Sequence, residues 1–426
     1  MKEIVNELIE FVENSDRLSD KLKMMFVNAI NNTFTTTIKI TDRDDAFVLT
    51  GDIPAMWLRD STAQIRPLFY IDSEESNELI KKVIKRQWFS IEKDTYANAF
   101  NEFGDGKEWN AYDITEHNPW VWERKYELDS LAYIFQLAYM YYEKTGDDSF
   151  IDDKFLEVLE VLVDQIKLEQ RHENSPYYFE RPEAWAPSDT LRCGGGTGTP
   201  TGYTKMSWTG FRPSDDSCVY QYLIPSNAFA AVSLRGICRM LQNSKKGNDL
   251  LINKIEILYK EIEEGINEFG IIQDEEYGRI YAYEVDGLGN SLFMDDANVP
   301  SLLSLPYLGF VDKDDEVYLN TRKAVLSEKN PFYFEGSIAK GVGSEHTPKN
   351  YIWHIGLAIQ AMTSNSEEEI KEILSIFEKT DAGTNLLHEG FHKDNANEFT
   401  REWFSWANSM FCETILMYLG KKVIKK

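Results

Sequence analysis

The feature that most constrains the fold is a helical hydrophobic periodicity that recurs in pairs of segments. Apolar residues follow the roughly 3.6-residue repeat over 131–138 and again over 155–166, and a Gly-Asp-Asp turn at 146–148 separates the two segments. A second pair follows at about 226–242 and 248–269. Neighbouring helices joined by a short turn are typical of αα-hairpins. The sequence therefore predicts a fold built from pairs of helices.

Further periodic segments bring the expected total to about a dozen helices. They lie at 1–33 (two helices broken at 14–16), 72–90, 299–305, 313–327, 351–364, 366–377 and 404–419, with helix starts at 72–75 and 366–369. Long aperiodic stretches at 95–124 and 171–218 hold many Trp, Arg and acidic residues, and 36–50 alternates as a short strand or hairpin would. We predict an all-α (α/α)6 barrel with long loops and a few short strands at its active-site end.

The composition limits the compartment and the partners. The 426 residues carry a net charge of −26, so the chain lacks the excess of Lys and Arg that nucleic-acid binding needs. No apolar run approaches the roughly 20 residues of a membrane span, the start does not resemble a signal peptide, and the four cysteines form neither a zinc nor a disulfide pattern. We expect one cytoplasmic, monomeric domain over residues 1–426; a two-domain helical protein is the alternative.

Residues 51–64 (GDIPAMWLRDSTAQ) combine apolar surface with fixed charges at the expected start of a helix. Asp60 and Ser61 are favourable N-cap types, which would place Arg59 at the helix end and aim it outward. Trp57 would then cover a small polar ligand that Arg59 and Asp60 bind, and the aromatic share of 13% favours a sugar. The alternative is a core tryptophan beside a surface ion pair.

Three other motifs fail physical tests. The Gly-rich run 193–202 lacks both the Gly-Lys-Ser/Thr of a P-loop and the G-x-G-x-x-G spacing. The acidic cluster 312–316 lacks the glycine on which a calcium loop turns. The H-E-G-F-H run at 388–392 has a zinc-protease spacing, but the glycines in and before it indicate a loop and not the required helix. The sequence therefore predicts no metal and no cofactor.

Two loops carry carboxylates that suit glycosidase chemistry. In 212–217 (RPSDDS) the proline fixes φ and helps to hold the acids in place, and 387–391 (LHEGF) carries Glu389 in a second polar loop. A glycosidase needs two opposed carboxyl groups, one protonated and one ionised. The residues alone do not choose between Asp215 and Asp216 as the proton donor.

Five runs along the chain carry a family resemblance: 51–61 (GDIPAMWLRDS), 127–132 (ELDSLA), 210–216 (GFRPSDD), 388–391 (HEGF) and 403–408 (WFSWAN). They resemble glycoside hydrolase family 125, the bacterial and fungal exo-acting α-1,6-mannosidases, over nearly the whole chain. The resemblance implies an (α/α)6 barrel, inversion of anomeric configuration and no metal requirement. It also implies that Asp216 is the general acid and Glu389 the general base.

On that resemblance we expect an α-mannoside oligosaccharide as the substrate, with its terminal mannose at the barrel mouth. The side chains expected to contact it are Trp57, Arg59, Asp60, Asp129, Arg212, His354 and Arg401. Three rivals remain to be separated. A sugar isomerase would use paired histidines such as His346 and His354, a glycan-binding protein would lack the acids, and an inverting phosphorylase would replace the base carboxylate with phosphate, which Glu389 argues against.

Overall fold

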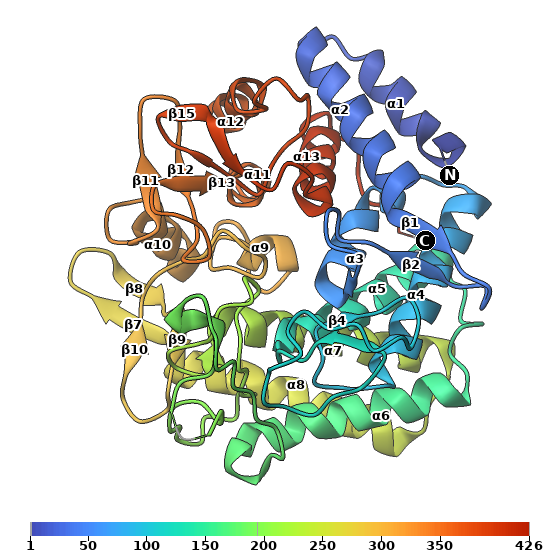
Figure 1. Ribbon diagram of the computed structural model, residues 1–426, viewed down its shortest axis with the longest axis vertical. Helices are drawn as coiled ribbons and strands as arrows, with labels where there is room; N and C mark the ends of the chain where they lie inside the picture. The colour runs from blue at the N-terminus through green and yellow to red at the C-terminus, as the bar shows by residue number, and fades with distance from the viewer. Residues whose placement is uncertain (1, 194, 426) are drawn as a thin grey trace.

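The computed structural model describes residues 2–193 and 195–425, and it is rich in helix, as predicted (Figure 1). The helices are α1 (Asn6–Glu13), α2 (Asp20–Asn32), α3 (Leu58–Ile65), α4 (Glu74–Ile91), α5 (Leu128–Thr145), α6 (Asp153–Leu168), α7 (Ile224–Ser244), α8 (Asp249–Phe269), α9 (Leu305–Leu308), α10 (Glu316–Val325), α11 (His354–Met362), α12 (Glu367–Lys379) and α13 (Ser405–Tyr418). Short 3-10 or π turns cover Lys2–Val5, Thr33–Thr37, Arg66–Tyr70, Glu169–Asn174 and Pro187–Asp189. Both predicted αα-hairpins are present, as α5–α6 and α7–α8.

The helices alternate along the chain between an inner and an outer set. Among the inner helices, α3 contacts α5, α5 contacts α7, α7 contacts α9, α11 contacts α13, and α13 returns to α3. Outer helices pack on them, with α4 on α5, α8 on α7, α12 on α11 and α2 on α13. Every residue of α3 and α11 is buried, whereas α12 buries one apolar face. No helix within the described ranges is long and apolar enough to cross a membrane.

The two ends of the chain meet. Figure 1 shows the first helices, α1 and α2, on the same side of the molecule as the last helix, α13, and α2 packs directly against α13. The last inner helix is thereby covered by the first outer helix. The single domain that the sequence predicts over residues 1–426 stays a prediction.

The strands are short and more numerous than the sequence predicts. They are β1 (Ile38–Ile40), β2 (Ala46–Val48), β3 (Met56–Trp57), β4 (Ala99–Phe100), β5 (Val121–Glu123), β6 (Tyr222–Leu223), β7 (Ile271–Asp274), β8 (Gly278–Tyr281), β9 (Glu284–Val285), β10 (Ser291–Leu292), β11 (Tyr333–Glu335), β12 (Lys340–Val342), β13 (Tyr351–Trp353), β14 (Gly390–His392) and β15 (Asn395–Thr400). They pair in the orders β1-β2, β3-β4-β5, β6-β9-β10, β7-β8, β11-β12 and β13-β14-β15. The segment 95–124, predicted as a loop, contains β4 and β5 because Ala99 pairs with Trp57 and Phe100 with Met56.

The two helix sets begin differently. Each outer helix from α2 onward has an N-cap side chain that accepts a hydrogen bond from the backbone N–H three residues later; these caps are Ser19, Ser73, Asp152, Asn248, Asp315 and Ser366. The helix starts predicted at 72–75 and 366–369 are thereby confirmed. In the described chain, no inner helix has such a bond, and their N-cap residues are Trp57, Glu127, Leu223, Ser304, Trp353 and Phe404.

The predicted cap of α3 is wrong. The helix begins at Leu58, directly after β3, so Asp60 and Ser61 lie within its first turn. The physical reason is the pairing of Trp57 with Ala99, which holds the chain extended up to the residue before the helix. Arg59 and Asp60 are consequently buried with the rest of α3.

Candidate active site

A cavity lies where the N-terminal ends of three inner helices come together. Trp57, Trp353 and Phe404, which precede α3, α11 and α13, all line it. The other lining residues are Thr50, Ile53, Arg59, Asp60, Pro213, Ser214, Asp215, Asn298, His346, Glu389, Arg401 and Trp406. Helix N-termini present free N–H groups and the positive end of the helix dipole. The position of the cavity therefore favours the carboxylates that surround it.

The inner cavity continues into an outer groove. Six residues line both spaces: Ile53, Trp57, Asp215, His346, Glu389 and Arg401. The groove adds Trp109 and Trp185, which are 52% and 63% exposed and come from the two long segments that the sequence marks as aperiodic. Exposed indole rings give a sugar ring a flat apolar surface to pack against.

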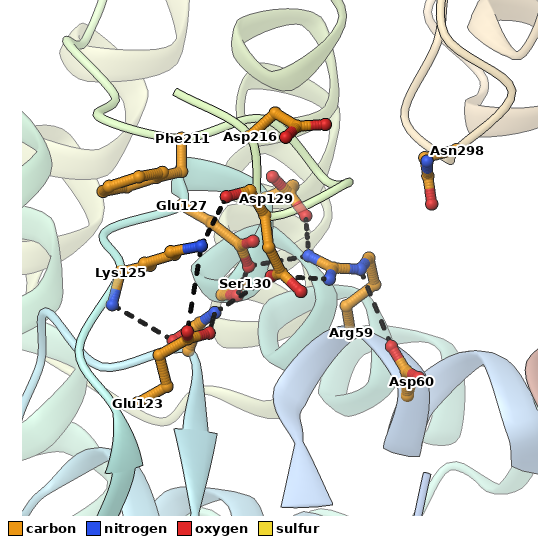
Figure 2. Close-up of polar contacts among 12 residues, drawn as sticks. Arg59, Asp60, Glu123, Lys125, Glu127, Asp129, Ser130, Phe211, Asp216 and Asn298 are labelled. Atoms are coloured by element: carbon orange, nitrogen blue, oxygen red, sulfur yellow. Dashed lines mark hydrogen bonds and ion pairs between the residues drawn. The ribbon is translucent and has the colours of Figure 1, made fainter. Parts of the chain in front are cut away.

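Arg59 is buried among acids instead of being aimed outward. Its Nη1 donates to Glu127 Oε2 over 2.6 Å and to Asp129 Oδ2 over 3.3 Å. Its Nη2 donates to Asp215 Oδ1 over 3.5 Å. Figure 2 shows the guanidinium with Glu127 and Asp129 on one side and Asp60 on the other. Arg59 therefore lines the cavity and also neutralises a buried acidic cluster.

The acids around Arg59 differ in protonation. Burial raises the pKa of Glu127 well above its usual range despite the adjacent Arg59, and burial raises the pKa of Asp129 to about 6. Burial would also raise the pKa of Asp215, but Arg59, a hydrogen bond with Glu127 and the ammonium of Lys125 hold it below its usual range. Asp215 is therefore ionised at neutral pH. An ionised carboxylate accepts hydrogen bonds from hydroxyl groups and has no proton to donate.

The backbone of the 212–217 turn is strained at the residue that faces the cavity. Asp215 has a φ of 68°, in the left-handed region that non-glycine residues rarely adopt. Asn98 Nδ2 donates to its Oδ1 over 3.2 Å, and Lys125 Nζ donates to its backbone O over 2.7 Å. Strain that surrounding contacts maintain in this way is typical of functional sites.

Asp216 occupies a different place from its neighbour. It is 1% exposed, and its Oδ2 lies 3.5 Å from His346 Nδ1. Figure 2 shows its carboxylate turned toward the side on which Asn298, a cavity residue, lies. Burial opposes ionisation of Asp216, but His346 holds its pKa below the usual range. Asp216 thus reaches the cavity wall through its contact with His346.

Glu389 comes from the C-terminal part of the chain and lines the cavity. It immediately precedes β14, and the pairing of Gly390 with Thr400 in β15 brings it next to Arg401. Glu389 Oε1 lies 3.7 Å from Arg401 Nη1, and Arg401 Nε donates to both carboxylate oxygens of Asp52 over 3.1 and 3.2 Å. Glu389 lines both the cavity and the groove.

Asp129 and Arg212, which the sequence predicts as substrate contacts, lie behind the cavity wall. Asp129 is fully buried and is held by Arg59. Arg212 is 1% exposed, and its guanidinium donates to Glu284 Oε1 over 2.6 Å and to Glu345 Oε2 over 2.8 Å. Both side chains use their polar atoms on other protein groups and neither lines the cavity, so their expected contacts with substrate stay predictions.

His354, another expected substrate contact, is buried and does not line the cavity, and its contact with substrate stays a prediction. Its ring nitrogens lie 2.8 Å from the backbone O of His388 and 2.9 Å from Thr380 Oγ1. Burial lowers its pKa to about 3, so the ring is neutral at physiological pH. Because His346 lines the cavity and His354 does not, the paired-histidine arrangement of an isomerase is not met.

Several cavity residues carry no signal in the sequence that marks them as sugar contacts. Trp353, Asn298 and His346 are isolated in the sequence and belong to no motif, and His346 has a role there only in the isomerase alternative. Trp406 belongs to the W-F-S-W-A-N run, which is the one signal that could have found it. The indole Nε1 atoms of Trp57 and Trp406 have no hydrogen-bond acceptor within the described chain. Both N–H groups are buried in the wall of the cavity.

The histidines of the H-E-G-F-H run serve packing. The ring of His388 stacks on Phe399 with a centroid distance of 3.9 Å, and the ring of His392 lies 5.7 Å from Tyr351. Across residues 2–193 and 195–425, no three His, Cys, Asp or Glu side chains are grouped as metal ligands.

Comparisons with known proteins identify the family of this chain. Residues 19–416 match the family described as metal-independent alpha-mannosidase (GH125). The Meiotically up-regulated gene 157 protein of Schizosaccharomyces pombe is 39% identical over 442 residues, which cover 98% of this chain and 86% of that protein.

Solved structures are similar too. A Streptococcus pneumoniae metal-independent alpha mannosidase, in a non-productive substrate complex with alpha-1,6-mannobiose, matches with a TM-score of 0.96 and 43% identity over 99% of both chains. A bacterial glucoamylase complexed with acarbose shares the fold alone, with a TM-score of 0.59 and 13% identity over 94% of this chain and 56% of that one. The chain therefore belongs to glycoside hydrolase family 125, the metal-independent α-mannosidases.

Proposed function

We propose that this α-mannosidase is an inverting, exo-acting enzyme that releases terminal α-1,6-linked mannose in a single displacement. Asp216 protonates the glycosidic oxygen, and Glu389 takes a proton from the attacking water. The observation that carries the proposal is that Glu389 and His346, the partner of Asp216, both lie where the inner cavity meets the outer groove. A glycosidic bond placed at this boundary has Glu389 beside it and faces Asp216 across His346.

The two spaces support exo action. The inner cavity receives the terminal mannose, and the groove with Trp109 and Trp185 receives the sugar that leaves. The α-1,6-mannobiose bound by the Streptococcus pneumoniae relative supports mannose with this linkage as the substrate. An α-mannoside oligosaccharide is the proposed natural substrate class.

The terminal mannose is recognised through its hydroxyls. Asp215 and Asp60 supply carboxylate acceptors at the cavity wall, and Trp57 and Trp406 supply indole N–H donors that lack a partner in the described chain. Arg59 supplies positive charge beneath the acids. Hydrogen bonds between charged groups and sugar hydroxyls are strong and select against sugars that lack them.

Electrostatics favour Asp216 over Asp215 as the acid. Arg59, Lys125 and a hydrogen bond with the protonated Glu127 hold Asp215 ionised. Asp216 is beside an imidazole that carries a proton, since carboxylates raise the pKa of His346 to about 9 despite burial. The residue with a proton at hand is the better donor.

We further propose that the alternating helices close into an (α/α)6 barrel. The contacts of α13 with α3, and those of the inner helices α3, α5, α7, α11 and α13 with outer helices, support closure. The low-identity likeness to a glucoamylase supports the same architecture. The cytoplasmic location and the monomeric state stay predictions.

The first experiment is NMR observation of the mannose anomer released from α-1,6-mannobiose. Inversion predicts that β-mannose appears first and then mutarotates; α-mannose as the first product would refute it. Inversion also predicts that the carboxyl groups of Asp216 and Glu389 are roughly 6.5–9.5 Å apart, with room for water between them.

Substitution then assigns the acid. Asp216→Asn should lower kcat on mannobiose roughly 10²–10⁴-fold. It should still hydrolyse α-mannosyl fluoride, whose leaving group needs no proton. Glu389→Gln should lose both activities, because the attacking water still needs a base. If Asp215→Asn spares the fluoride selectively and Asp216→Asn does not, the acid is Asp215.

A further inference from the structure

His346 stands between the proposed acid and base, and the mechanism above does not use it in a chemical step. It lies in the segment between β12 and β13 and lines both the inner cavity and the outer groove. Its Nδ1 is 3.5 Å from Asp216 Oδ2. Across the described chain, neither atom makes a hydrogen bond to any other residue. No competing bond therefore draws either group away from the other.

Arg212 fixes this geometry. Its backbone N–H donates to the backbone O of Asp216 over 2.8 Å, and its Nη1 donates to Glu345 Oε2 over 2.8 Å. Arg212 thus bonds both to Asp216 in the 212–217 turn and to Glu345, the residue before His346. The imidazole also meets the ring of Trp185 edge-on, with a centroid distance of 5.7 Å. The imidazole and the carboxylate are held at this separation from both sides.

Carboxylates face the imidazole from two loops. Asp216 and Asp215 belong to the 212–217 turn, and Glu389 precedes β14. The cations near these acids are Arg59, Lys125, Arg212 and Arg401. Burial opposes a charge on His346, but the three carboxylates raise its pKa to about 9, and His346 in turn lowers the pKa of Asp216. At neutral pH the proton is therefore on the imidazole, although the acid must deliver it.

We propose that His346 and Asp216 share one catalytic proton, which rests on His346 and passes to Asp216 when substrate fills the cavity. This inference rests on the proposed role of Asp216 as general acid. It makes His346 a positioning and proton-holding residue for the acid, distinct from the groups that bind the sugar.

The steps balance. The Nδ1 proton of the imidazolium moves to Asp216 Oδ2, which leaves a neutral ring and a neutral carboxyl group. Asp216 then donates that proton to the glycosidic oxygen as the bond to C1 breaks, and Glu389 takes one proton from the water that attacks C1. After product leaves, Glu389 releases its proton to solvent and His346 regains one through the outer groove.

Substrate supplies the driving force for the transfer. A sugar in the cavity displaces water from around the pair, and loss of water disfavours the ion pair relative to the neutral pair. The leaving oxygen also offers a new hydrogen-bond acceptor to a protonated Asp216. Asp216 is thus protonated, and able to act as an acid, only when the site is loaded.

The test is the pH dependence of kcat/KM on α-1,6-mannobiose. In the wild type the pair keeps its shared proton up to about pH 9, so the alkaline limb lies high. In His346→Gln, Asp216 must hold the proton alone, and we expect the alkaline limb to move to lower pH by about one unit or more, with activity best retained on the acidic side. His117→Gln, an exposed histidine outside the cavity, is the matched control and should leave the profile unchanged.

A uniform loss of activity at every pH, with the limb in place, would overturn the proposal and make His346 a structural or sugar-contacting residue. A second measurement covers the case in which His346→Gln folds poorly. NMR titration of the imidazole should give a pKa for His346 that is well above the ordinary value in the wild type and falls in Asp216→Asn. An unchanged His346 titration in Asp216→Asn would refute the shared proton. If Asp216→Asn stays active on mannobiose, the proposed acid is wrong, whatever the titration shows.

Discussion

Arg59→Met tests whether one buried guanidinium holds the acidic cluster together. Methionine keeps an unbranched apolar chain but removes the charge that faces Glu127, Asp129 and Asp215. Removing one partner of a buried ion pair costs about 3–5 kcal/mol. Burial already raises the pKa of Glu127, so that carboxyl stays protonated in the variant. Because a neutral carboxyl group is not an unpaired buried charge, the loss of stability is smaller. We expect the free energy of unfolding to fall by about 3 kcal/mol at pH 7.

The penalty should depend on pH in a defined direction. Without Arg59, Asp129 and Asp215 are buried acids whose folded pKa values exceed the unfolded value of about 3.9. The folded variant then binds more protons than the unfolded chain, so its stability falls as pH rises through the folded pKa values. The difference from wild type should therefore be larger at pH 8 than at pH 5.

Urea unfolding followed by tryptophan fluorescence measures this difference. Arg66→Met is the matched control, because Arg66 Nη2 donates to Glu413 Oε1 over 2.7 Å in a buried pair whose residues do not line the cavity. Both variants should lose stability, but only Arg59→Met should lose affinity for free mannose. A loss below about 1 kcal/mol in Arg59→Met, or an equal loss at pH 5 and pH 8, would refute the account of the cluster.

Three further predictions address the cavity, the groove and the interior. Trp57→Phe keeps an aromatic ring but removes an N–H that has no acceptor within the described chain, so KM for mannobiose should rise about 2–10-fold without a change in melting temperature; an unchanged KM would show that this N–H does not bind substrate. Trp185→Ala should lower kcat/KM for mannobiose several-fold and leave inhibition by free mannose intact, because the ring lines the groove and not the inner cavity; weaker mannose inhibition would contradict that division. His354 is kept neutral by burial, which lowers its pKa to about 3, so its contribution to stability is complete above the unfolded pKa of about 6.5 and declines as pH falls. The difference in unfolding free energy between wild type and His354→Asn should therefore shrink between pH 7 and pH 4, and a constant difference would contradict the assignment.

Much of the helical framework could be predicted, because it depends on local patterns. Hydrophobic periodicity located both αα-hairpins, and side chains such as Ser73 and Ser366 marked helix starts that the structure confirms. These signals extend over only a few neighbouring residues, so they can be recognised in the sequence without knowledge of the tertiary fold. The short strands could not be found in the same way. β4 exists because Ala99 pairs with Trp57, and a pairing between distant segments leaves no periodic trace in two residues.

The site was only partly predictable for a related reason. Trp57, Arg59, Asp60, Glu389 and Arg401 line the cavity as expected. Charged residues in the motifs could be identified, but not whether each faces the ligand or the protein. Three polar residues that could bind a sugar instead make hydrogen bonds to protein groups: Asp129, Arg212 and His354. Neighbouring residues also differ: Asp215 faces the cavity and Asp216 faces His346, a distinction that arises from the left-handed φ at Asp215.

The absence of caps on the inner helices explains why the site lies where it does. A helix start leaves backbone N–H groups without intrahelical partners, and an outer helix satisfies one with a cap such as Ser19 or Asp152. The inner helices α3, α11 and α13 have Trp57, Trp353 and Phe404 at that position, none of which can accept such a bond. Their positive ends therefore stay directed at the cavity, where a helix dipole favours negative charge and partly offsets the burial that raises the pKa of Asp60.

That arrangement also predicts a sequence signature. A ring of helices whose alternate members lack polar N-caps should have its polar site at the uncapped ends, because only there do free N–H groups and helix dipoles converge. A cap at Asp60 or Ser61 would be expected only if a nearby side chain accepted a hydrogen bond from the free backbone N–H groups at every helix start. Here Asp60 instead accepts from Thr50 and faces the cavity, where burial raises its pKa. Moving the start of α3 by a few residues would turn Arg59 and Asp60 away from the acids, so the uncapped start is a condition for the site to exist.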